Sequence, residues 1–243
     1  MDIKKRLDKY LVEYLNVNSR NLSQKLINNN CVLVNKNIIN KPNFLVNEND
    51  IVEILKEEKY VSRAAYKLLF ALEKFNIDIS NKIVMDIGSS TGGFTQVCLE
   101  NNAAKIYCID VGKNQLSPKV KDNEKVYLYE QTNFKDINAL DFNDVNFITC
   151  DVSFISIQKI LNKIKELNWK NISGIFLLKP QFELTPKEIS KGKGKVHPKL
   201  LNHVINSFKT FCKNNNFDLI NICESPIKGA KKNNIEFLTY LRW

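Results

Sequence analysis

Hydrophobic residues in the first part of the chain follow two different periods. Over residues 4–15, apolar side chains recur every three or four positions, which predicts an amphipathic helix. Ser19 is placed to cap a second helix that stops in the asparagine run at 28–30. Short β-like segments follow at 31–35, 38–39 and 50–55. Two helices that lead into a small sheet form a module too small to hold a deep active site.

From Ser62 onward, apolar segments of five or six residues alternate with helical patterns, beginning with a helix that Ser62 is expected to cap. Strands are expected at 82–88, 105–110, 125–130, 146–151, 174–180, 217–225 and 235–243, and further helices near 92–101, 156–167 and 198–215. This alternation predicts an α/β fold with a mainly parallel sheet covered on both faces. The last two strands have a short connection, so we expect them to pair antiparallel.

The change of pattern divides the chain into two expected domains. The charged stretch at 56–60 is interpreted as a linker, which gives a small α+β domain at 1–58 and a Rossmann-like α/β domain at 59–243.

A loop of small residues follows the first strand of the larger domain, in the segment MDIGSSTGGFTQVCL (85–99). Glycines let the backbone turn sharply and approach a ligand at the carboxyl end of a strand, where open α/β sheets bind ligands. The spacing Gly88-x-x-x-Gly92-Gly93 is not the dinucleotide fingerprint GxGxxG, and a P-loop is excluded because its lysine is missing. Asp110 ends the next strand, where an acidic side chain can bind ribose hydroxyls. A plain glycine-rich turn beside a surface aspartate is the alternative interpretation.

Four ionisable residues stand at strand ends, inside a strand or on the first helix of the larger domain: Lys67, Asp151, Lys179 and Glu236. Two of them directly follow an apolar strand, in CDVSF and LLKPQFE, and therefore lie at the ligand-binding edge of the sheet. We expect Glu236 inside the last apolar strand, where an ionised side chain is costly unless it is paired. Singly, each has a simpler explanation as a capping carboxylate or a solvated lysine. Together they indicate a polar cluster beside the ligand.

The charge balance is strongly basic, with 36 Lys and Arg against 26 Asp and Glu and a net charge of +10. Such a balance favours polyanionic partners because each neutralised phosphate releases counterions. It does not by itself distinguish nucleic acid from an anionic membrane surface. No apolar run approaches the ~20 residues that span a bilayer, and the charged start MDIKKRLDKY does not resemble a signal peptide. We therefore expect a cytoplasmic protein that does not bind membranes.

Cysteine and histidine usage argues against disulfides and metal sites. The six cysteines form no CxxC pair and lie mostly among apolar neighbours, so we expect reduced, buried thiols. His197 and His203 are the only histidines, which leaves no basis for a zinc site.

The whole chain resembles the hemolysin A (TlyA-type) family, whose members join an RNA-binding domain like that of small-subunit ribosomal protein S-four to an FtsJ-like methyltransferase domain. The matching segments run in order from end to end: RLDKYL (6–11), SRNLSQKLI (19–27), VLVN (32–35), KYVSRAAYKL (59–68), DIGSSTGGFT (86–95), DVGKNQL (110–116), DVSFIS (151–156), KPQFE (179–183) and NIEFL (234–238).

This resemblance implies a class I methyltransferase fold that uses S-adenosyl-L-methionine for 2'-O-methylation of ribose in ribosomal RNA, at cytidines, with ribosomal subunits as partners. FtsJ-like enzymes use a Lys-Asp-Lys-Glu tetrad, which the four ionisable residues above match. By the same likeness, the Gly88 loop binds the methionine part, Asp110 the ribose and Asn133 the adenine edge. The full set implied to bind the cofactor is Asp86, Gly88, Ser89, Ser90, Thr91, Gly92, Gly93, Phe94, Asp110, Val111, Asn133, Phe134 and Asp151.

Basic residues in both domains are expected to follow the RNA backbone: Arg6, Arg20, Lys25, Arg63, Lys191, Lys193 and Lys195. The run at 187–199 has glycines between lysines, which indicates either a loop that closes on RNA or a solvated charged loop.

Lys179 is the expected group at the 2'-hydroxyl. Burial and the like charge of Lys67 would lower its pKa toward a useful base, whereas Asp151 and Glu236 would raise it and leave Lys179 as a cation that orients the hydroxyl. Two other function classes remain open: a non-enzymatic RNA-binding assembly factor, and a cytolysin, which no spanning segment or amphipathic β-repeat supports.

Overall fold

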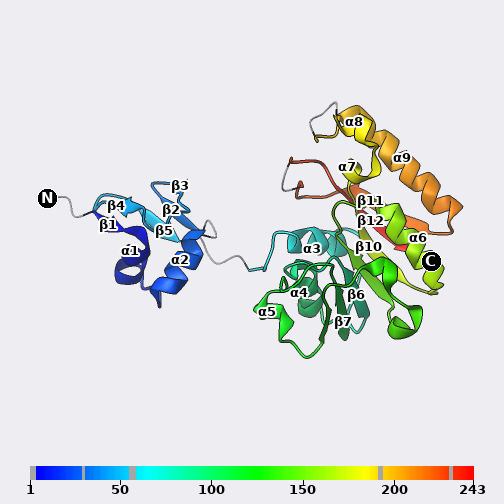
Figure 1. Ribbon diagram of the computed structural model, residues 1–243, viewed down its shortest axis with the longest axis horizontal. Coiled ribbons are helices and arrows are strands. Elements are labelled where there is room, and N and C mark those ends of the chain that lie inside the picture. Colours follow the sequence, from blue (N-terminus) through cyan, green and yellow to red (C-terminus); the bar gives the residue numbers. More distant parts are fainter. Residues whose placement is uncertain (1–3, 29–30, 55–58, 191–193, 230–231) are drawn as a thin grey trace. The chain divides into compact units, whose positions relative to one another are not determined.

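The computed structural model describes residues 4–28, 31–54, 59–190, 194–229 and 232–243 (Figure 1). The described residues fall into two compact units, one within 1–59 and one within 60–243. The expected linker at 56–60 lies mostly outside the described residues.

The first unit packs two helices against short antiparallel strands. The expected helices are confirmed as α1 (Leu7–Tyr14) and α2 (Arg20–Asn28), and the Ser19 hydroxyl accepts a hydrogen bond from Leu22 N at 3.2 Å. The strands are β1 (Lys5–Arg6), β2 (Val32–Val34), β3 (Asn37–Ile38), β4 (Leu45–Val46) and β5 (Val52–Ile54). The first helix begins later than expected because Lys5–Arg6 forms a strand that pairs with β4. A strand of two residues has no period that could be recognised in the sequence.

The second unit is built on a seven-stranded sheet, and every strand expected from the sequence is present. The strands are β6 (Ile83–Ile87), β7 (Lys105–Ile109), β8 (Val126–Tyr129), β9 (Phe147–Cys150), β10 (Ser173–Leu178), β11 (Asp218–Glu224) and β12 (Phe237–Arg242). Their order is β11-β12-β10-β9-β6-β7-β8. The five strands from β10 to β8 are parallel, while β12 runs antiparallel to both β10 and β11, as expected for the last pair.

Helices cover both faces of this sheet, which gives the three-layer α/β architecture predicted for the larger domain. One hydrophobic cluster joins the sheet to α3 (Ala65–Lys74), α4 (Gly93–Glu100) and α5 (Pro118–Lys121). A second cluster joins the other face to α6 (Ile157–Leu167) and α9 (Pro198–Asn214). Shorter helical segments are α7 (Pro180–Glu183), α8 (Pro186–Ser190), η1 (Phe134–Asp136) and η2 (Ala139–Phe142).

Three local expectations are wrong. Ser62 does not cap α3, which starts three residues later after a turn in which Ala65 N donates to Ser62 O at 3.2 Å. Glu236 lies one residue before β12 rather than inside it. Part of the run expected as a loop, from Lys187 on, is helical in α8 because Thr185 and Glu188 close its first turn.

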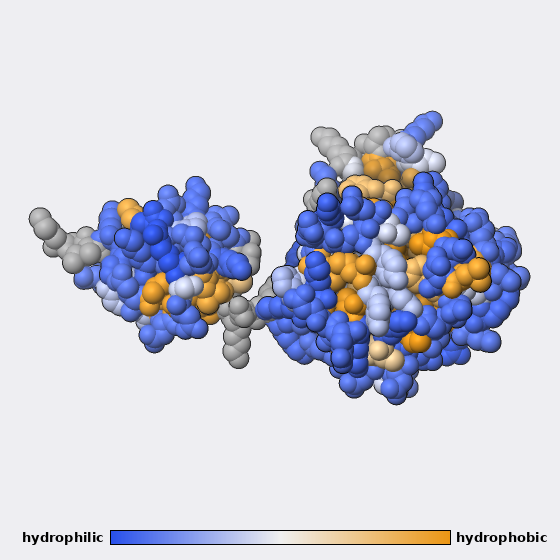
Figure 2. Space-filling view, turned by 60° about the horizontal axis from the view of Figure 1, so that its bottom comes forward, coloured by the Kyte–Doolittle hydropathy of each residue, from blue (hydrophilic) through white to orange (hydrophobic). Residues whose placement is uncertain are grey.

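The surface of both units seen in Figure 2 is mainly hydrophilic, with small hydrophobic patches. No helix in the described part of the chain is both long and apolar enough to cross a membrane.

Candidate active site

The strand order reverses between β6 and β9, because the chain runs from β6 to one edge of the sheet and then returns to β9 on the other side. Open α/β sheets bind ligands at the carboxyl ends of strands beside such a reversal. A cavity of about 720 Å³ lies there, within the second unit. Gly88, Asp110 and Asp151 directly follow β6, β7 and β9, and all three line the cavity.

The glycine loop after β6 depends on backbone conformations that favour glycine. Gly88 has φ +81°, and an added Cβ would meet Val152 Cγ1 at 3.1 Å and the Asp151 carbonyl oxygen at 3.2 Å. Gly93 begins α4, and a Cβ there would collide with Ser62 Oγ. The loop therefore packs against the residues after β9 and those before α3, with no room for side chains at these two points.

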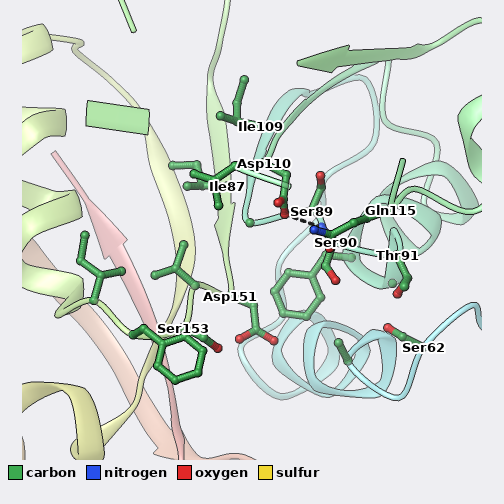
Figure 3. Close-up of a pocket in the computed structure, with 18 of the residues that line it drawn as sticks. Ser62, Ile87, Ser89, Ser90, Thr91, Ile109, Asp110, Gln115, Asp151 and Ser153 are labelled. Carbon is green, nitrogen blue, oxygen red and sulfur yellow. Dashed lines mark hydrogen bonds between the residues drawn. The ribbon is translucent and has the colours of Figure 1, made fainter. Parts of the chain in front are cut away.

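The carboxylate of Asp110 is fixed by the backbone on both of its oxygens. Ser90 N donates to Oδ2 at 2.8 Å and Gly112 N donates to Oδ1 at 2.7 Å. Figure 3 shows Asp110 and Gln115 at one end of the cavity and Asp151 and Ser153 at the other. Each carboxylate oxygen keeps a second lone pair, so Asp110 can still accept hydrogen bonds from two ligand hydroxyls.

Asp86 lies beneath the glycine loop and does not line the cavity. It is 1% exposed and accepts hydrogen bonds from the hydroxyls of Thr95 at 2.7 Å and Thr149 at 2.9 Å. Burial raises the pKa of Asp86 to about 6, and the two hydroxyls oppose that rise. Its contacts make Asp86 a support for the strand end rather than a ligand contact.

The four expected tetrad residues meet at the other end of the cavity, in one chain of ion pairs. Lys67 Nζ lies 2.7 Å from Glu236 Oε2 and 3.3 Å from Asp151 Oδ2. Lys179 Nζ lies 2.6 Å from Asp151 Oδ1 and donates to Ser153 Oγ at 3.1 Å. Lys67, Lys179 and Asp151 line the cavity, while Glu236 stands behind Lys67. Below, "the tetrad" means Lys67, Asp151, Lys179 and Glu236.

Sheet topology explains why residues so far apart in sequence converge. Asp151 and Lys179 follow the parallel neighbours β9 and β10, so both stand at the same sheet edge. Glu236 precedes the antiparallel β12, whose first residue Phe237 pairs with Leu178, and this register brings Glu236 to the same edge.

The tetrad is almost fully buried, with Lys67, Lys179 and Glu236 exposed by 8, 7 and 3%. Burial alone lowers the pKa of Lys67, but the carboxylates of Asp151 and Glu236 outweigh it and raise that pKa above 10.5. Burial would likewise raise the pKa of Asp151, but Lys179 and Lys67 hold it below 3.8. The expectation that a buried Glu236 must be paired is met by its contact with Lys67.

Glu183, at the end of α7, braces the segments that carry Lys179 and Asp151. Its carboxylate accepts hydrogen bonds from Ser156 Oγ at 2.6 Å and Ile157 N at 2.7 Å, at the start of α6. The sequence pattern indicated no role for Glu183, although it lies in KPQFE, four residues after Lys179.

Most residues expected to bind the cofactor line the cavity, and Asp86 and Gly92 are the two that do not. Gly92 instead adopts φ +92° at the start of α4, packed toward Leu116 and Val120. Arg63, expected to contact RNA, also lines the cavity. Lining residues for which the sequence indicated no role in the site include Ser62, Gln115, Thr132, Ser153, Phe154, Ile227 and Lys228. Ser153 and Phe154 belong to the segment DVSF. Ser153 could have been recognised as a site residue because it is a polar residue two positions after Asp151, at the end of a strand.

In the first unit, two of the expected RNA-binding residues share one buried carboxylate. Asp8 is fully buried and accepts from Arg6 Nε and Nη2, both at 3.0 Å, from Arg20 Nε at 2.9 Å and from Gln24 Nε2 at 3.0 Å. The side-chain hydrogen bond from Arg6 is the largest cause that holds the pKa of Asp8 well below its usual range. Below, "the arginine pair" means Arg6 and Arg20.

The other expected RNA-binding residues are scattered. Lys25 is exposed in the last turn of α2, and Lys195 is exposed ahead of α9. Lys191 and Lys193 lie outside the described residues.

Family comparisons agree with this architecture. The model of the FtsJ-like methyltransferase family matches residues 60–243, and the model of the S4 domain matches residues 5–52. The chain belongs to the FtsJ-like methyltransferase family and, by its full-length relatives, to the hemolysin A or TlyA group.

Three relatives show how far the similarity extends. Hemolysin A of Brachyspira hyodysenteriae is 42% identical over 97% of this chain and 98% of its own length. The 23S rRNA (cytidine-2'-O)-methyltransferase TlyA of Campylobacter jejuni is 40% identical, with coverage of 97% and 98%. The solved structure of a Streptococcus thermophilus protein, described as a candidate hemolysin, superposes with a TM-score of 0.74 at 32% identity, covering 99% of this chain and 89% of that one.

Proposed function

We propose that this protein transfers the methyl group of S-adenosyl-L-methionine to the 2'-hydroxyl of a cytidine in ribosomal RNA. The observation that carries the proposal is the buried tetrad at one end of the cavity, with the glycine loop beside it and Asp110 at the other end. The name of the Campylobacter jejuni relative supports the same reaction and nucleoside. A substrate within ribosomal subunits implies that the enzyme works in the cytoplasm.

The residues around the loop fit the proposed cofactor. The cavity volume lies within the ~300–1,000 Å³ range of small-molecule sites. Asp110 offers lone pairs to a ribose diol, and Gly88 leaves the backbone open where a methionine moiety would lie. The Ser89 hydroxyl is buried and lacks a hydrogen-bond partner among the described residues, so a ligand group can satisfy it. When bound, S-adenosyl-L-methionine supplies an electrophilic methyl group on a positively charged sulfur.

The chain's own residues must bring the ribose hydroxyl into line with that methyl group and receive its proton as the new carbon–oxygen bond forms. Lys179 is the proposed contact with the hydroxyl because it lines the cavity with Asp151 and Ser153 as its neighbours. Its nitrogen either accepts the proton or holds the oxygen while water takes the proton. Lys67 remains a cation, since its pKa is raised, and so keeps the Asp151 carboxylate ionised and aimed at Lys179.

The proposed division of labour assigns RNA affinity to residues 1–58 and chemistry to residues 59–243. The S4-domain match and the outward arginine pair support the first part. A fragment that starts at Lys59 should still bind S-adenosyl-L-methionine but lose most of its RNA methylation. Undiminished methylation by this fragment would contradict the division.

Transfer of labelled methyl to purified ribosomal subunits, followed by mapping of the modified ribose, tests the reaction directly. We expect label on a cytidine 2'-oxygen. Tight binding of S-adenosyl-L-methionine or of RNA without any transfer would instead favour a non-enzymatic assembly factor.

Cofactor binding at the glycine loop is tested by Gly88→Val. The valine requires a positive φ and presses on Val152 and the Asp151 carbonyl, so binding measured by calorimetry should be lost. Gly194→Ala is the matched control because Gly194 also has a positive φ, +87°, but its added Cβ meets nothing nearer than 3.7 Å. Wild-type binding by Gly88→Val would show that the cofactor lies elsewhere.

A further inference from the structure

A second cavity, of about 400 Å³, lies in the same unit and shares Lys228 with the first. Lys228 lines both cavities, whereas its neighbour Ile227 lines only the first. A ligand that extends from the first cavity past Lys228 can therefore enter the second.

The wall of the second cavity is apolar inside and basic or amide-bearing outside. Val196, Leu201 and Ile235 belong to or pack against the hydrophobic core and supply the apolar part. The exposed side chains on its wall are Lys195, His197, Pro198, Lys228 and Asn233. None of the described residues that line it is acidic. This composition suits a flat, uncharged ring joined to a negatively charged backbone.

The cavity is built into the catalytic framework through Asn234, which is 6% exposed. Asn234 Oδ1 accepts from Val196 N at 3.0 Å, and its Nδ2 donates to the Gly194 carbonyl at 3.0 Å. Gly229 N donates to the Asn234 carbonyl at 2.9 Å. Asn234 precedes Glu236 by two residues in the segment that leads into β12. This one segment therefore positions both the wall of the second cavity and the Glu236 side chain of the tetrad.

His197 is held in a defined orientation at the rim. Its Nδ1 accepts from Lys199 N at 3.2 Å, as the cap of α9. In the neutral ring the proton is then on Nε2, which leaves one donor and the ring face for a ligand. Histidine is among the side chains on which unpaired RNA bases stack.

We propose that the second cavity binds one unpaired nucleobase of the substrate RNA, next to the ribose that receives the methyl group. The base lies on the apolar wall against His197, and Lys195 and Lys228 contact the phosphates on either side of it. The inference rests on the proposed function, because it needs an RNA substrate in the first cavity.

Steady-state methylation of ribosomal subunits gives the first test, with the full-length His197→Ala variant. Loss of one stacking contact should raise the KM for subunits about tenfold and leave kcat within about twofold. His203→Ala is the matched control, since His203 is exposed on the same helix and does not line the cavity. Unchanged binding of S-adenosyl-L-methionine checks that both variants are folded. An unchanged KM in His197→Ala would overturn the proposal.

A cross-linking experiment locates the base. The photoreactive residue p-benzoylphenylalanine replaces His197, or His203 in the control, and the protein is irradiated on ribosomal subunits. We expect the residue at position 197 to cross-link a nucleotide directly beside the methylated ribose and the residue at position 203 not to do so. A cross-link to a distant nucleotide, to a ribosomal protein or to nothing overturns the inference while the wild-type chain still methylates. If the wild-type chain methylates no ribose, the proposed function fails, and this inference falls with it.

Discussion

The two compact units both hold cations on buried carboxylates, but they leave different charges for a ligand. In the first unit a single buried carboxylate, Asp8, holds the arginine pair, whose side chains stay 41% and 51% exposed. In the second unit two carboxylates hold two lysines, and all four side chains are nearly buried. The first arrangement has one positive charge in excess at the surface, whereas the charges of the second are balanced and largely buried at the end of the cavity.

This difference teaches what each cluster is suited to do. Partly exposed guanidiniums that are fixed from below lose little freedom when they bind a phosphate, and their attraction is weakened by salt. Buried ammonium and carboxylate groups are screened little, so each one strongly sets the protonation of the next. The first cluster is therefore suited to binding a backbone, and the second to controlling one proton.

The largest effect that would break the comparison comes from Lys179→Ala. We expect methyl transfer to fall by at least ~10²–10⁴-fold, because base catalysis or hydroxyl positioning is lost. Cofactor affinity should stay nearly unchanged, since the proposed partner of Lys179 is the RNA hydroxyl and not the cofactor. Lys159→Ala, on the exposed face of α6, is the control and should methylate normally. Near wild-type methylation by Lys179→Ala would remove this lysine from the mechanism.

Lys179→Arg separates the two roles proposed for this residue. Arginine keeps the positive charge but is not deprotonated in proteins, so it cannot replace a general base. Partial activity would show that a cation that orients the hydroxyl is sufficient. Complete loss would agree with a base, although the changed shape contributes to it.

Glu236→Gln tests how strongly the closed cluster depends on its balance. Lys67 would keep only Asp151 at 3.3 Å, so we expect a loss of about 3 kcal/mol of stability and a lower kcat. Because the paired Lys67 has a raised pKa, its share of stability is present at neutral pH and is lost only as pH rises above 10.5. Urea unfolding at pH 7 measures the effect, and a change under 1 kcal/mol would show that the pair is not effectively buried.

Asp86 is a third kind of buried carboxylate, held by hydroxyls and not by cations, and Asp86→Asn tests its contribution to stability. The pKa of Asp86 rises from 3.8 to about 6, so the unfolded chain loses this proton first as pH rises and folding weakens by about 3 kcal/mol across that window. Asparagine does not titrate, so the free energy of unfolding of the variant, measured in urea, should increase relative to that of the wild type from pH 4 to pH 7. Asp78→Asn is an opposite control, since the backbone of Ser80 lowers the pKa of Asp78. Equal differences at both pH values would contradict the prediction.

Asp8→Asn should have the smallest effect. Water can solvate the exposed arginine pair once the charge beneath it is gone, so we expect about 1–2 kcal/mol of destabilisation, confined to the first unit. Hydrogen exchange resolved by unit measures it, and Glu13→Gln, at an exposed ion pair with Lys5, is the matched control. A loss of stability as large as that of Glu236→Gln would mean that solvent exposure of the arginine pair does not reduce the cost of removing its carboxylate.

The sequence predicted the sheet of the second unit well because its strands are apolar runs buried on both faces. Phe147–Cys150, for example, is completely buried, and such a run has few alternatives once helices flank it. The sequence predicted β4 and the start of α3 poorly, since a two-residue strand has no period and Ser62 forms a turn where a cap was expected. Short elements are decided by tertiary contacts that no local pattern records.

The convergence of the tetrad could be anticipated only in part. Strand ends placed Asp151 and Lys179 together, but the role of Glu236 depends on the antiparallel register of β12, which sequence alone left open. The pairing of Arg6 and Arg20 through Asp8 was not anticipated either. An aspartate two residues after an arginine, in the first turn of an amphipathic helix, looks like any exposed charged residue in the sequence.

The position of β12, between β10 and β11, also determines when during translation the tetrad can form. Lys67 and Glu236 are 169 residues apart, which at roughly 5–20 residues per second corresponds to about 10–30 s of translation. For most of that interval the nascent chain already contains the glycine loop and Asp110, but β12 has not yet been made and cannot pair with β10. A chain in the course of being made thus has no complete tetrad while it is tethered to a ribosome, a particle rich in ribose hydroxyls. The proposed catalytic group is therefore complete only after β12 has been made and has paired with β10.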